Sequence, residues 1–358
     1  MTTTPTTLDR FKEAMQCVYG LFETLPPTQL STWTPPPKSG GHGGRYLWTD
    51  AFGVINFLTL YHTTSSPKYL TFARSLVESV HNTLGTTRDG TSRLPGASDN
   101  NPLGGGLRIG KLDEIGPDGD GQYHHYLTLW MFALNRLSVA ASEPQYNRLA
   151  IQLAKAIHPR FVFKSELGGI KMVWKISMDM KKVLVPSEGH LDALTGYVVF
   201  SLLQEAEGSG SGVLKEQIED YRQMMMKEGK MTVSNDPLDL GMGLWVCHLF
   251  AGREDWAAKL GKEAIVKSRS LLKETSGLLN RSPHYRLAFR EFGLCLGIRC
   301  FDGDDLLNAR VDSLLHFWEE YLKEVTADDL RPITLVMYAA ALIPGAMKDM
   351  YWAEKSAA

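Results

Sequence analysis

Six segments of the chain are apolar on nearly every side, and such segments are stable only where other protein surrounds them. A helix that is apolar all round must be buried all round. The six segments begin at Ala51, Tyr126, Ala193, Leu240, Glu291 and Ile333. Between them lie charged segments with apolar residues at spacings of three and four, the pattern of a helix with one face in water. They cover 66–82, 145–158, 214–229, 253–274 and 304–324. The sequence therefore predicts an all-α protein in which buried and half-exposed helices alternate.

The spacing of the apolar segments indicates a repeat. Polar clusters that precede them lie near Asp50, Gln122, His190, Asp236, His284 and Asp329, at intervals of 72, 68, 46, 48 and 45 residues. Such a quasi-period indicates repeated helical hairpins. We expect six hairpins that form one (α/α)6 toroid domain over residues 1–358, with the amphipathic segment 8–25 as the sixth outer helix. An open solenoid is the competing architecture, but its units would not include six helices apolar all round.

Three insertions interrupt this pattern. Residues 34–44 are rich in Pro and Gly, and residues 86–119 show no helical periodicity. In residues 160–185 apolar and polar residues alternate locally, which predicts a short β-hairpin. Because long loops in a compact domain are often functional, we expect all three insertions near the rim of a pocket.

Each buried helix is predicted to be polar at its start and apolar afterwards. In a toroid of parallel inner helices, the six starts would converge on one rim of a central funnel. Capping and the helix dipole explain acidic or hydroxyl residues there, so Ser187, Asp236 and Asp328 or Asp329 are interpreted as caps. Capping does not explain the other polar side chains, which are His124, His125, His190, His284 and Arg286. The sequence therefore predicts a pocket.

Three blocks carry a resemblance to a known superfamily. They are GGRYLWTDAFGV (43–54), DGQYHHYLTLWM (120–131) and MVWKISMDMKKVLVPSEGHLDAL (172–194). Together with the alternating hairpins, they resemble uncharacterised members of the six-hairpin glycosidase-like superfamily. That superfamily includes glycoside hydrolases and the N-acylglucosamine 2-epimerase group. The resemblance implies an (α/α)6 fold and an enzyme of sugar chemistry, although a fold by itself does not fix a function.

Glycoside hydrolysis is the leading functional hypothesis. It needs two carboxyl groups across a sugar-sized cleft, one protonated and one ionised. Asp50 and Glu188 come from different hairpins and are the predicted catalytic pair; salt bridging or capping is the alternative role for Asp50. Other carboxylates are assigned to substrate binding, namely Asp120, Asp192, Asp236 and Glu291. Aromatic rings are predicted to bind a ring-shaped substrate, namely Trp48, Tyr123, Tyr126, Trp174 and Trp245.

Isomerisation without a cofactor is the second hypothesis. Proton transfer beside a carbonyl favours bases with a pKa near neutrality, most readily His. His190 and His284 come from different hairpins, and Arg286 is predicted to hold an oxyanion. Gln122, His125 and Tyr126 would share a helix face at i, i+3 and i+4, so Gln122 is assigned to binding and His125 to catalysis. Only one of the adjacent His124 and His125 is expected to face the pocket.

Elimination or cyclisation of a non-sugar is a third hypothesis for the same acid–base pocket. In every case the predicted partner is a small polar or ring-shaped molecule. The net charge is −2 and basic residues are dispersed, so neither nucleic acid nor a membrane surface is expected as a partner. The sequence makes no prediction of the oligomeric state.

Metal and phosphate motifs are weak. The chain lacks HxxxH and HExxH spacings, and Glu188, His190 and Asp192 form only a loose cluster, so neither a catalytic metal nor another cofactor is predicted. Gly105, Gly110 and Lys111 imitate a phosphate-binding loop, but Leu112 occupies the position that needs Ser or Thr. The N-terminal segment shows no secretory signal pattern, and a cytoplasmic location is expected.

Overall fold

The computed structural model describes residues 5–116, 118–164, 166, 169–208, 210–273, 275–301, 304–349 and 351. Residue 117 of the predicted insertion 86–119 and residues 165, 167 and 168 of the insertion 160–185 lie outside the described residues. The chain divides into two compact units, residues 26–231 and residues 1–25 with 232–358. The interpretation of the chain as one domain stays a prediction.

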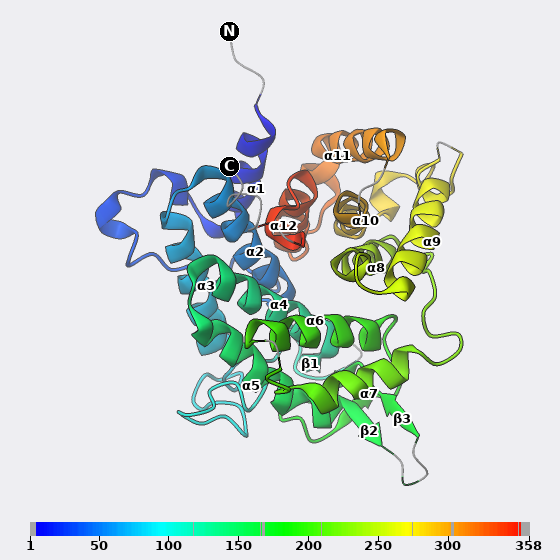
Figure 1. Cartoon of the computed structure of the whole chain (residues 1–358). Helices are drawn as coiled ribbons and strands as arrows, with labels where there is room; N and C mark the ends of the chain where they lie inside the picture. The colour runs from blue at the N-terminus through cyan, green and yellow to red at the C-terminus, as the bar shows by residue number, and fades with distance from the viewer. Residues whose placement is uncertain are drawn as a thin grey trace. The chain divides into compact units, whose positions relative to one another are not determined.

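The unit of residues 26–231 contains three helical hairpins, drawn in blue to green in Figure 1. Its inner helices are α2 (Leu47–Thr64), α4 (His124–Ala141) and α6 (Asp192–Ala206). Its outer helices are α3 (Lys68–Leu84), α5 (Pro144–Phe161) and α7 (Lys215–Met225). The inner helices α2 and α6 both pack against α4, and each inner helix also packs against the outer helix that follows it.

The other unit contains the remaining hairpins. Its inner helices are α8 (Pro237–Phe250), α10 (Ala288–Phe301) and α12 (Arg331–Leu342), and α10 packs against both neighbours. The outer helices α9 (Asp255–Leu271) and α11 (Asp305–Val325) pack against α8 and α10, respectively. The N-terminal helix α1 (Thr7–Tyr19) packs against α12. This contact confirms the prediction that the N-terminal segment completes the sixth hairpin.

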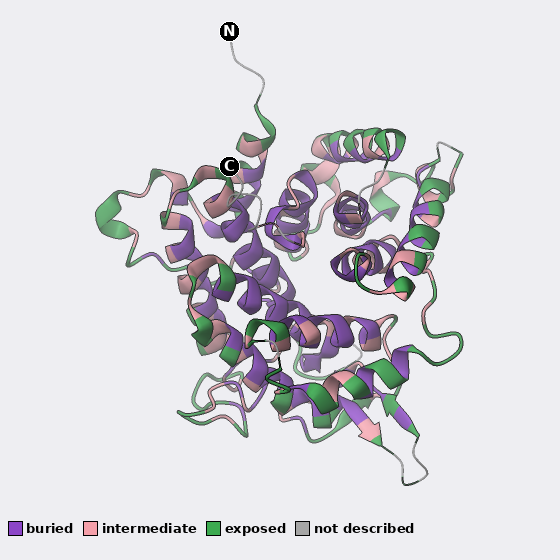
Figure 2. Ribbon diagram, viewed as in Figure 1, coloured by how far each residue is buried: buried purple, intermediate pink, exposed green. Residues whose placement is uncertain are grey.

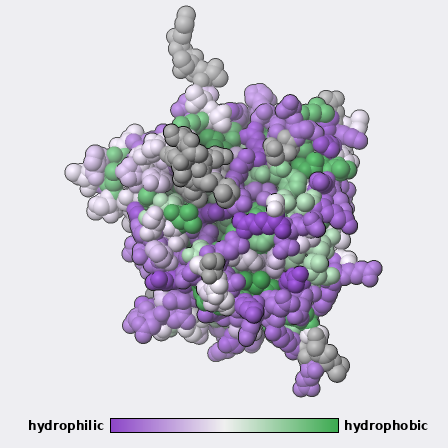
Figure 3. Space-filling view, in the orientation of Figure 1, coloured by the Kyte–Doolittle hydropathy of each residue, from purple (hydrophilic) through white to green (hydrophobic). Residues whose placement is uncertain are grey.

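Burial follows the sequence pattern. Figure 2 shows the inner helices almost wholly buried and the outer helices buried on one side. In α3, for example, the buried residues Tyr69, Phe72, Leu76 and Val80 recur every three or four positions. Hydrophilic residues dominate the face of the molecule seen in Figure 3, as expected where outer helices meet water.

Glycines bring α8 and α10 close together. A Cβ atom added at Gly241 would lie 2.0 Å from the carbonyl oxygen of Gly293, and one added at Gly297 would lie 2.1 Å from that of Gly241. No side chain fits such a distance, so these backbones can approach only where Gly is present.

One of the predicted helix N-caps is confirmed, and the others are wrong. Asp236 caps α8 by accepting the backbone N–H groups of Leu238 and Asp239, with Pro237 in the first turn, so this prediction is confirmed. The predictions for Ser187 and for Asp328 or Asp329 are wrong, because α6 and α12 begin after Leu191 and Leu330 without a side-chain cap.

Short strands form the predicted β insertion. Strands β2 (Val162–Lys164) and β3 (Ile170–Met172) pair antiparallel, with Val162 opposite Met172. Strand β4 (Lys175–Ile176) pairs antiparallel with both β1 (Gln122–Tyr123) and β5 (Val183–Val185). The predicted hairpin is confirmed, and the structure adds a second one. Because β1 leads directly into α4, this sheet fixes the insertion at the start of an inner helix.

Four short 3₁₀ helices complete the described elements, at Phe22–Thr24, Pro27–Gln29, Pro283–Tyr285 and Gly345–Met347. Within the described ranges, no helix is both long enough and apolar enough to cross a membrane.

Candidate active site

Six of the predicted site residues meet in the unit of residues 26–231, at the starts of its three inner helices. We call this group the aromatic site. Trp48 lies in the first turn of α2, His125 and Tyr126 in the first turn of α4, and Asp192 at the first position of α6. Tyr123 lies in β1, and Trp174 lies between β3 and β4.

Backbone hydrogen bonds from the insertions hold these helix starts. The first N–H group of α4, that of His124, donates to the carbonyl of Trp174 at 3.0 Å. The N–H group of Trp174 donates to the carbonyl of Ser187 at 3.1 Å, and the N–H of Leu47 at the start of α2 donates to the carbonyl of Ile109 at 3.0 Å. The first N–H groups of a helix lack intrahelical partners, so the carbonyls of Trp174 and Ile109 act as caps, and the bond to Ser187 holds Trp174 in place. The insertions thereby fix where the side chains of the aromatic site lie.

Two adjacent histidines flank one carboxylate oxygen in this site. Nδ1 of His125 lies 3.7 Å from Oδ1 of Asp192, and Nδ1 of His124 lies 3.9 Å from the same atom. These distances are ion-pair distances rather than hydrogen bonds. The side chain of His125 is 36% exposed, whereas His124 is fully buried. As predicted from their spacing, only one of the two histidines is accessible.

The start of α6 is shaped around Asp192. Leu191, the residue before the helix, has φ 58° and ψ 14°, a left-handed conformation that is unfavourable for a bulky residue. A Cβ atom added at Gly189 would lie 2.3 Å from Oδ2 of Asp192. Backbone strain and close approach of this kind cluster at functional sites. Both features place the buried carboxylate against the two histidines.

The charge state of the group favours a neutral His125 beside an ionised Asp192. Burial alone would raise the pKa of the Asp192 carboxyl, but His124 and His125 outweigh burial and hold that pKa below its ordinary value. Burial lowers the pKa of His125; Asp192 opposes this shift and His124 adds to it. A neutral imidazole next to a carboxylate is the form that accepts a proton as a general base.

Aromatic rings surround His125. Its ring centroid lies 4.9 Å from that of Tyr126, 6.0 Å from those of Trp48 and Tyr123, and 6.1 Å from that of Trp174. Such surfaces suit the apolar faces of a sugar ring. One residue of the site was not among the residues predicted from the sequence: the hydroxyl of Tyr46 lies 2.5 Å from that of Tyr126. Its position just before the predicted helix was the only available signal.

Asp50, the first predicted catalytic carboxylate, is completely buried. Its Oδ1 accepts a hydrogen bond from Arg45 at 3.1 Å, and the same guanidinium donates to the carbonyl of Pro36 and to the hydroxyl of Ser39. This arrangement ties the insertion 34–44 to the start of α2. The geometry favours the alternative role that the sequence left open, a structural ion pair.

Asp120 and Gln122 hold the insertion 86–119. The carboxylate of Asp120 accepts from both Arg88 and Arg108 and from the backbone N–H groups of Gly110 and Gly121. Gln122 lies in β1 rather than in α4, so the predicted shared face with His125 is wrong. Its amide is fully buried and bonds to Leu107, Gly105 and Met178. Both side chains are occupied by the protein itself.

Glu188 and His190 lie in the segment before α6. The carboxylate of Glu188 pairs with the ammonium group of Lys230, and His190 is exposed. Among the described residues, neither Glu188 nor His190 makes a hydrogen bond or an ion pair with the side chain of His125 or Asp192. The role of Glu188 as the partner of Asp50 in catalysis stays a prediction. Across the described parts of the chain, no group of three or more His, Cys, Asp or Glu is arranged to hold a metal ion.

The predicted residues of the other unit make internal contacts. Glu291 accepts two hydrogen bonds from Arg286, at 2.8 and 2.6 Å, and one from the indole of Trp318 at 2.8 Å. The indole of Trp245 is buried and donates to the carbonyl of Met347. The second oxygen of Asp236 accepts from Arg290, and His284 is exposed. These contacts favour structural roles for Glu291, Arg286, Trp245 and Asp236.

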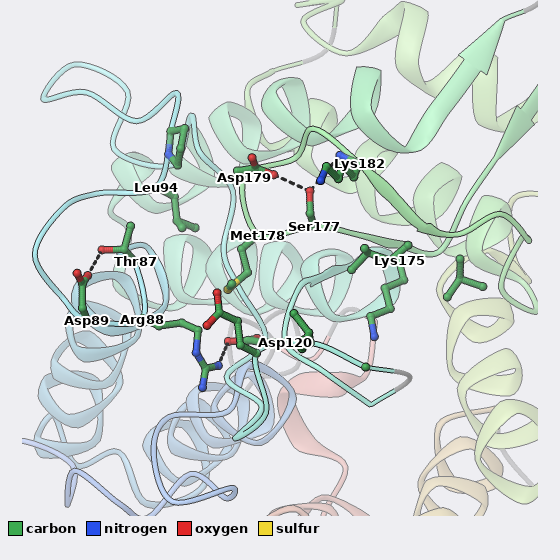
Figure 4. Close-up of a pocket in the computed structure, with 16 residues that line it drawn as sticks. Thr87, Arg88, Asp89, Leu94, Asp120, Lys175, Ser177, Met178, Asp179 and Lys182 are labelled. Atoms are coloured by element: carbon green, nitrogen blue, oxygen red, sulfur yellow. Dashed lines mark hydrogen bonds and ion pairs between the residues drawn. The ribbon is translucent and has the colours of Figure 1, made fainter.

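A cavity of about 800 Å³ lies between the insertion 86–119 and the hairpin β4–β5 (Figure 4). Its acidic side chains are largely engaged: Asp120 by Arg88, Asp89 by Thr87 and Asp179 by Ser177. The ammonium group of Lys175 lies 5.1 Å from the ring centroid of Tyr123. Lys175 lines this cavity and contacts Tyr123, a residue of the aromatic site, whereas His125 does not line the cavity.

No protein-family model matches the chain, and no curated protein matches its sequence. Solved structures do match it. A sugar epimerase from a ruminal bacterium is 11% identical, with a TM-score of 0.57 over 92% of this chain and 98% of its own. An inactive variant of an α-1,6-mannanase of Salegentibacter, in complex with α-1,6-mannotriose, is 11% identical, with a TM-score of 0.58 over 94% and 98%.

A third match extends the comparison to disaccharide epimerases. The cellobiose 2-epimerase from Spirochaeta thermophila is 12% identical, with a TM-score of 0.53 over 96% of this chain and 99% of its own. Identities this low carry information about fold only, since one fold hosts many reactions. The chain has the all-α (α/α)6 fold of these solved structures.

Proposed function

We propose that the protein is a sugar isomerase or epimerase in which His125, oriented by Asp192, removes and returns a proton at carbon. The observation that carries the proposal is the accessible imidazole of His125, 3.7 Å from a buried carboxylate and surrounded by aromatic rings. Sugar epimerases with the same fold support it.

The proposed reaction begins with an open-chain aldose, whose C2 proton is acidic because it lies beside the C1 carbonyl. Nε2 of neutral His125 takes that proton, and the electron pair of the C2–H bond forms an enediolate with its charge on O1. Return of the proton to C1, together with transfer of the O2 proton to O1, gives a ketose. Return of the proton to the other face of C2, with the C1 carbonyl re-formed, gives the epimer. Asp192 stabilises the imidazolium that exists between the two transfers.

The tyrosine pair supplies a donor for O1. The hydroxyl groups of Tyr46 and Tyr126 share one hydrogen bond, and Tyr46 is buried while Tyr126 is partly exposed. In this proposal Tyr126, the more exposed of the two, turns its hydroxyl proton towards O1 when the substrate binds, and Tyr46 orients it. A phenol donor that points at the developing oxyanion stabilises the transition state.

Glycoside hydrolysis is the second candidate, favoured by the mannanase that shares the fold. It requires a protonated and an ionised carboxyl group on opposite sides of the sugar. Of the carboxylates at the inner-helix starts of the unit of residues 26–231, Asp50 and Asp192 are both buried. The aromatic site therefore fits proton transfer by His better than hydrolysis. Elimination from a non-sugar would start with the same proton abstraction and remains the third hypothesis.

Solvent isotope labelling separates these reactions. The protein is incubated in D₂O with cellobiose, glucose or mannose, and the loss of the H2 resonance is followed by proton NMR. We expect deuterium at C2 and a new epimer or ketose, and we expect His125→Asn to abolish both. Hydrolysis of α-1,6-mannotriose without deuterium at carbon would overturn the proposal in favour of a glycosidase. Deuterium incorporation that survives His125→Asn would also overturn it.

A further inference from the structure

Behind the aromatic site lies a second, fully buried layer of polar groups. The hydroxyl of Tyr221, on the outer helix α7, lies 2.7 Å from Nε2 of His124. Neither side chain is exposed. Through His124 this phenol is connected to Asp192, and through Asp192 to His125. The proposed function uses only the last two residues of this series.

The hydrogen bond between Tyr221 and His124 has two possible directions. If the phenol donates to Nε2, the proton of neutral His124 sits on Nδ1 and faces the carboxylate of Asp192. If His124 donates instead, the lone pair of Nδ1 faces the carboxylate oxygen, and the phenol proton has no acceptor among the described residues. The first direction gives the phenol proton an acceptor and places an N–H group, rather than a lone pair, 3.9 Å from Oδ1 of Asp192. That distance is too long for a hydrogen bond, but the attraction between the N–H dipole and the carboxylate favours this direction.

Glycine in α6 makes room for this phenol. A Cβ atom added at Gly196 would lie 2.7 Å from two carbons of the Tyr221 ring and 2.8 Å from a third. Gly196 follows Asp192 by four residues, so both lie on the same face of α6. Gly in a helix interior costs about 1 kcal/mol relative to Ala, which makes its presence here informative. One helix face thus provides both the carboxylate and the slot for the phenol.

We propose that Tyr221 is a positioning residue of the aromatic site: it fixes His124 as the Nδ1–H tautomer, which keeps Asp192 ionised and aimed at His125. The inference rests on the proposed function for its catalytic meaning, but the tautomer of His124 is a property of the resting protein. In the opposite tautomer, a lone pair would face the carboxylate and favour its protonation. A protonated Asp192 would no longer stabilise the imidazolium of His125.

Other titratable groups also face Tyr221. The ring of His158, on α5, lies edge-on at 5.3 Å from that of Tyr221. Nε2 of His158 lies 3.5 Å from Asp220, which in turn pairs with Lys164 at 2.7 Å. Burial lowers the pKa of His158 to about 4, so this histidine is neutral at neutral pH. The tautomer of His124 is therefore compared at neutral pH, where His158 carries no charge.

Nitrogen-15 NMR of the imidazole groups tests the inference directly. In the wild type we expect His124 to carry its proton on Nδ1. In Tyr221→Phe, which keeps the ring, we expect His124 to lose this preference and the pKa of His125 to fall. Gly196→Ala should give the same changes by displacing the phenol. Tyr69→Phe, at another fully buried tyrosine of the same unit, is the matched control and should leave both readouts unchanged.

Kinetics then connects the tautomer to turnover. For Tyr221→Phe we expect kcat to fall about tenfold with KM unchanged, the size of one lost hydrogen bond. The acid limb of the pH profile should move to lower pH with the pKa of His125. A His124 that carries its proton on Nε2 in the wild type, or a tautomer unchanged in Tyr221→Phe, would overturn the inference. Failure of the proposed function is distinct, because the wild type would then turn over no sugar whatever the tautomer.

Discussion

Oδ1 of Asp192 lies 3.7 Å from Nδ1 of His125, and the two residues come from the first turns of adjacent inner helices, α6 and α4. The same oxygen lies 3.9 Å from His124, which is buried. One carboxylate therefore lies between two imidazoles, the accessible one of His125 and the buried one of His124. The packing of α4 against α6 sets the distance between Asp192 and His125. The fold therefore directly determines the chemistry of this site.

Replacing Asp192 by Asn should impair proton transfer far more than folding. Asn has the same size but no charge, so the imidazolium of His125 loses its stabilising partner. We expect turnover to fall by roughly 10²–10⁴ and the pKa of His125 to drop further, measured by steady-state kinetics and NMR titration. Asp50→Asn is the contrasting variant: it leaves the buried Arg45 without its counter-charge, so stability should fall. Equal losses of turnover with unchanged melting in both variants would contradict these roles.

A fall in pH should lower the free energy of unfolding, because it favours protonation of His81. The indole of Trp130 donates to Nε2 of His81 at 3.1 Å, so this nitrogen must stay unprotonated. Burial lowers the pKa of His81 to about 4, below the unfolded value of about 6.5. The stabilisation is thus fully present above pH 6.5 and is lost as the pH falls towards 4, by on the order of 1–3 kcal/mol. Denaturation measured against pH should show this slope, and His81→Gln, which keeps an acceptor, should flatten it.

Substitution of Glu291 distinguishes a structural role from a substrate-binding role in the other unit. Its carboxylate and the guanidinium of Arg286 are both nearly inaccessible, and Trp318 donates to the same carboxylate. Removing one charge of a buried pair leaves the other uncompensated, so Glu291→Gln should lower the free energy of unfolding by roughly 3–5 kcal/mol. Asp328→Asn, which breaks an exposed pair with Arg331, should cost well under about 1 kcal/mol. An unchanged melting temperature with weakened sugar binding in Glu291→Gln would support the substrate-binding role instead.

The fold could be predicted because helices buried on all sides are rare and leave a clear signal. The segment from Leu240, for instance, has no polar face that could meet water, and its helix α8 is buried as expected. The pairing of α1 with α12 followed from counting hairpins. Convergence of all six polar starts on one rim stays a prediction, as does the assignment of the three insertions to that rim.

The site could be predicted only in part, because sequence shows which polar residues start a helix but not what they contact. The sequence singles out Trp48, His125 and Trp174 because aromatics and histidines exceed what capping requires, and the structure brings these three together. Asp50 was assigned to catalysis and Glu291 to substrate binding, but each has an Arg five residues before it in the chain that neutralises it in the fold. Tyr221 gave no signal, since a Tyr on the buried face of an outer helix resembles any core residue. Its role depends on Gly196, which lies on another helix.

Gln122 is predicted to hold the insertion 86–119 in place and, through it, the aromatic site. Its buried amide bonds to the N–H of Leu107 and to the carbonyls of Gly105 and Met178. Gln122→Leu keeps the volume and leaves three backbone groups unsatisfied, so we expect a loss of roughly 2–4 kcal/mol and faster amide exchange across 105–110. Because Ile109 caps the helix that carries Trp48, KM for the sugar should also rise. Gln152→Ala, which removes a single exposed bond of 3.4 Å to the same insertion, is the matched control and should change neither quantity measurably. If exchange at 105–110 is unaltered in Gln122→Leu, the insertion is held by other contacts, and its connection to the aromatic site through this amide is refuted.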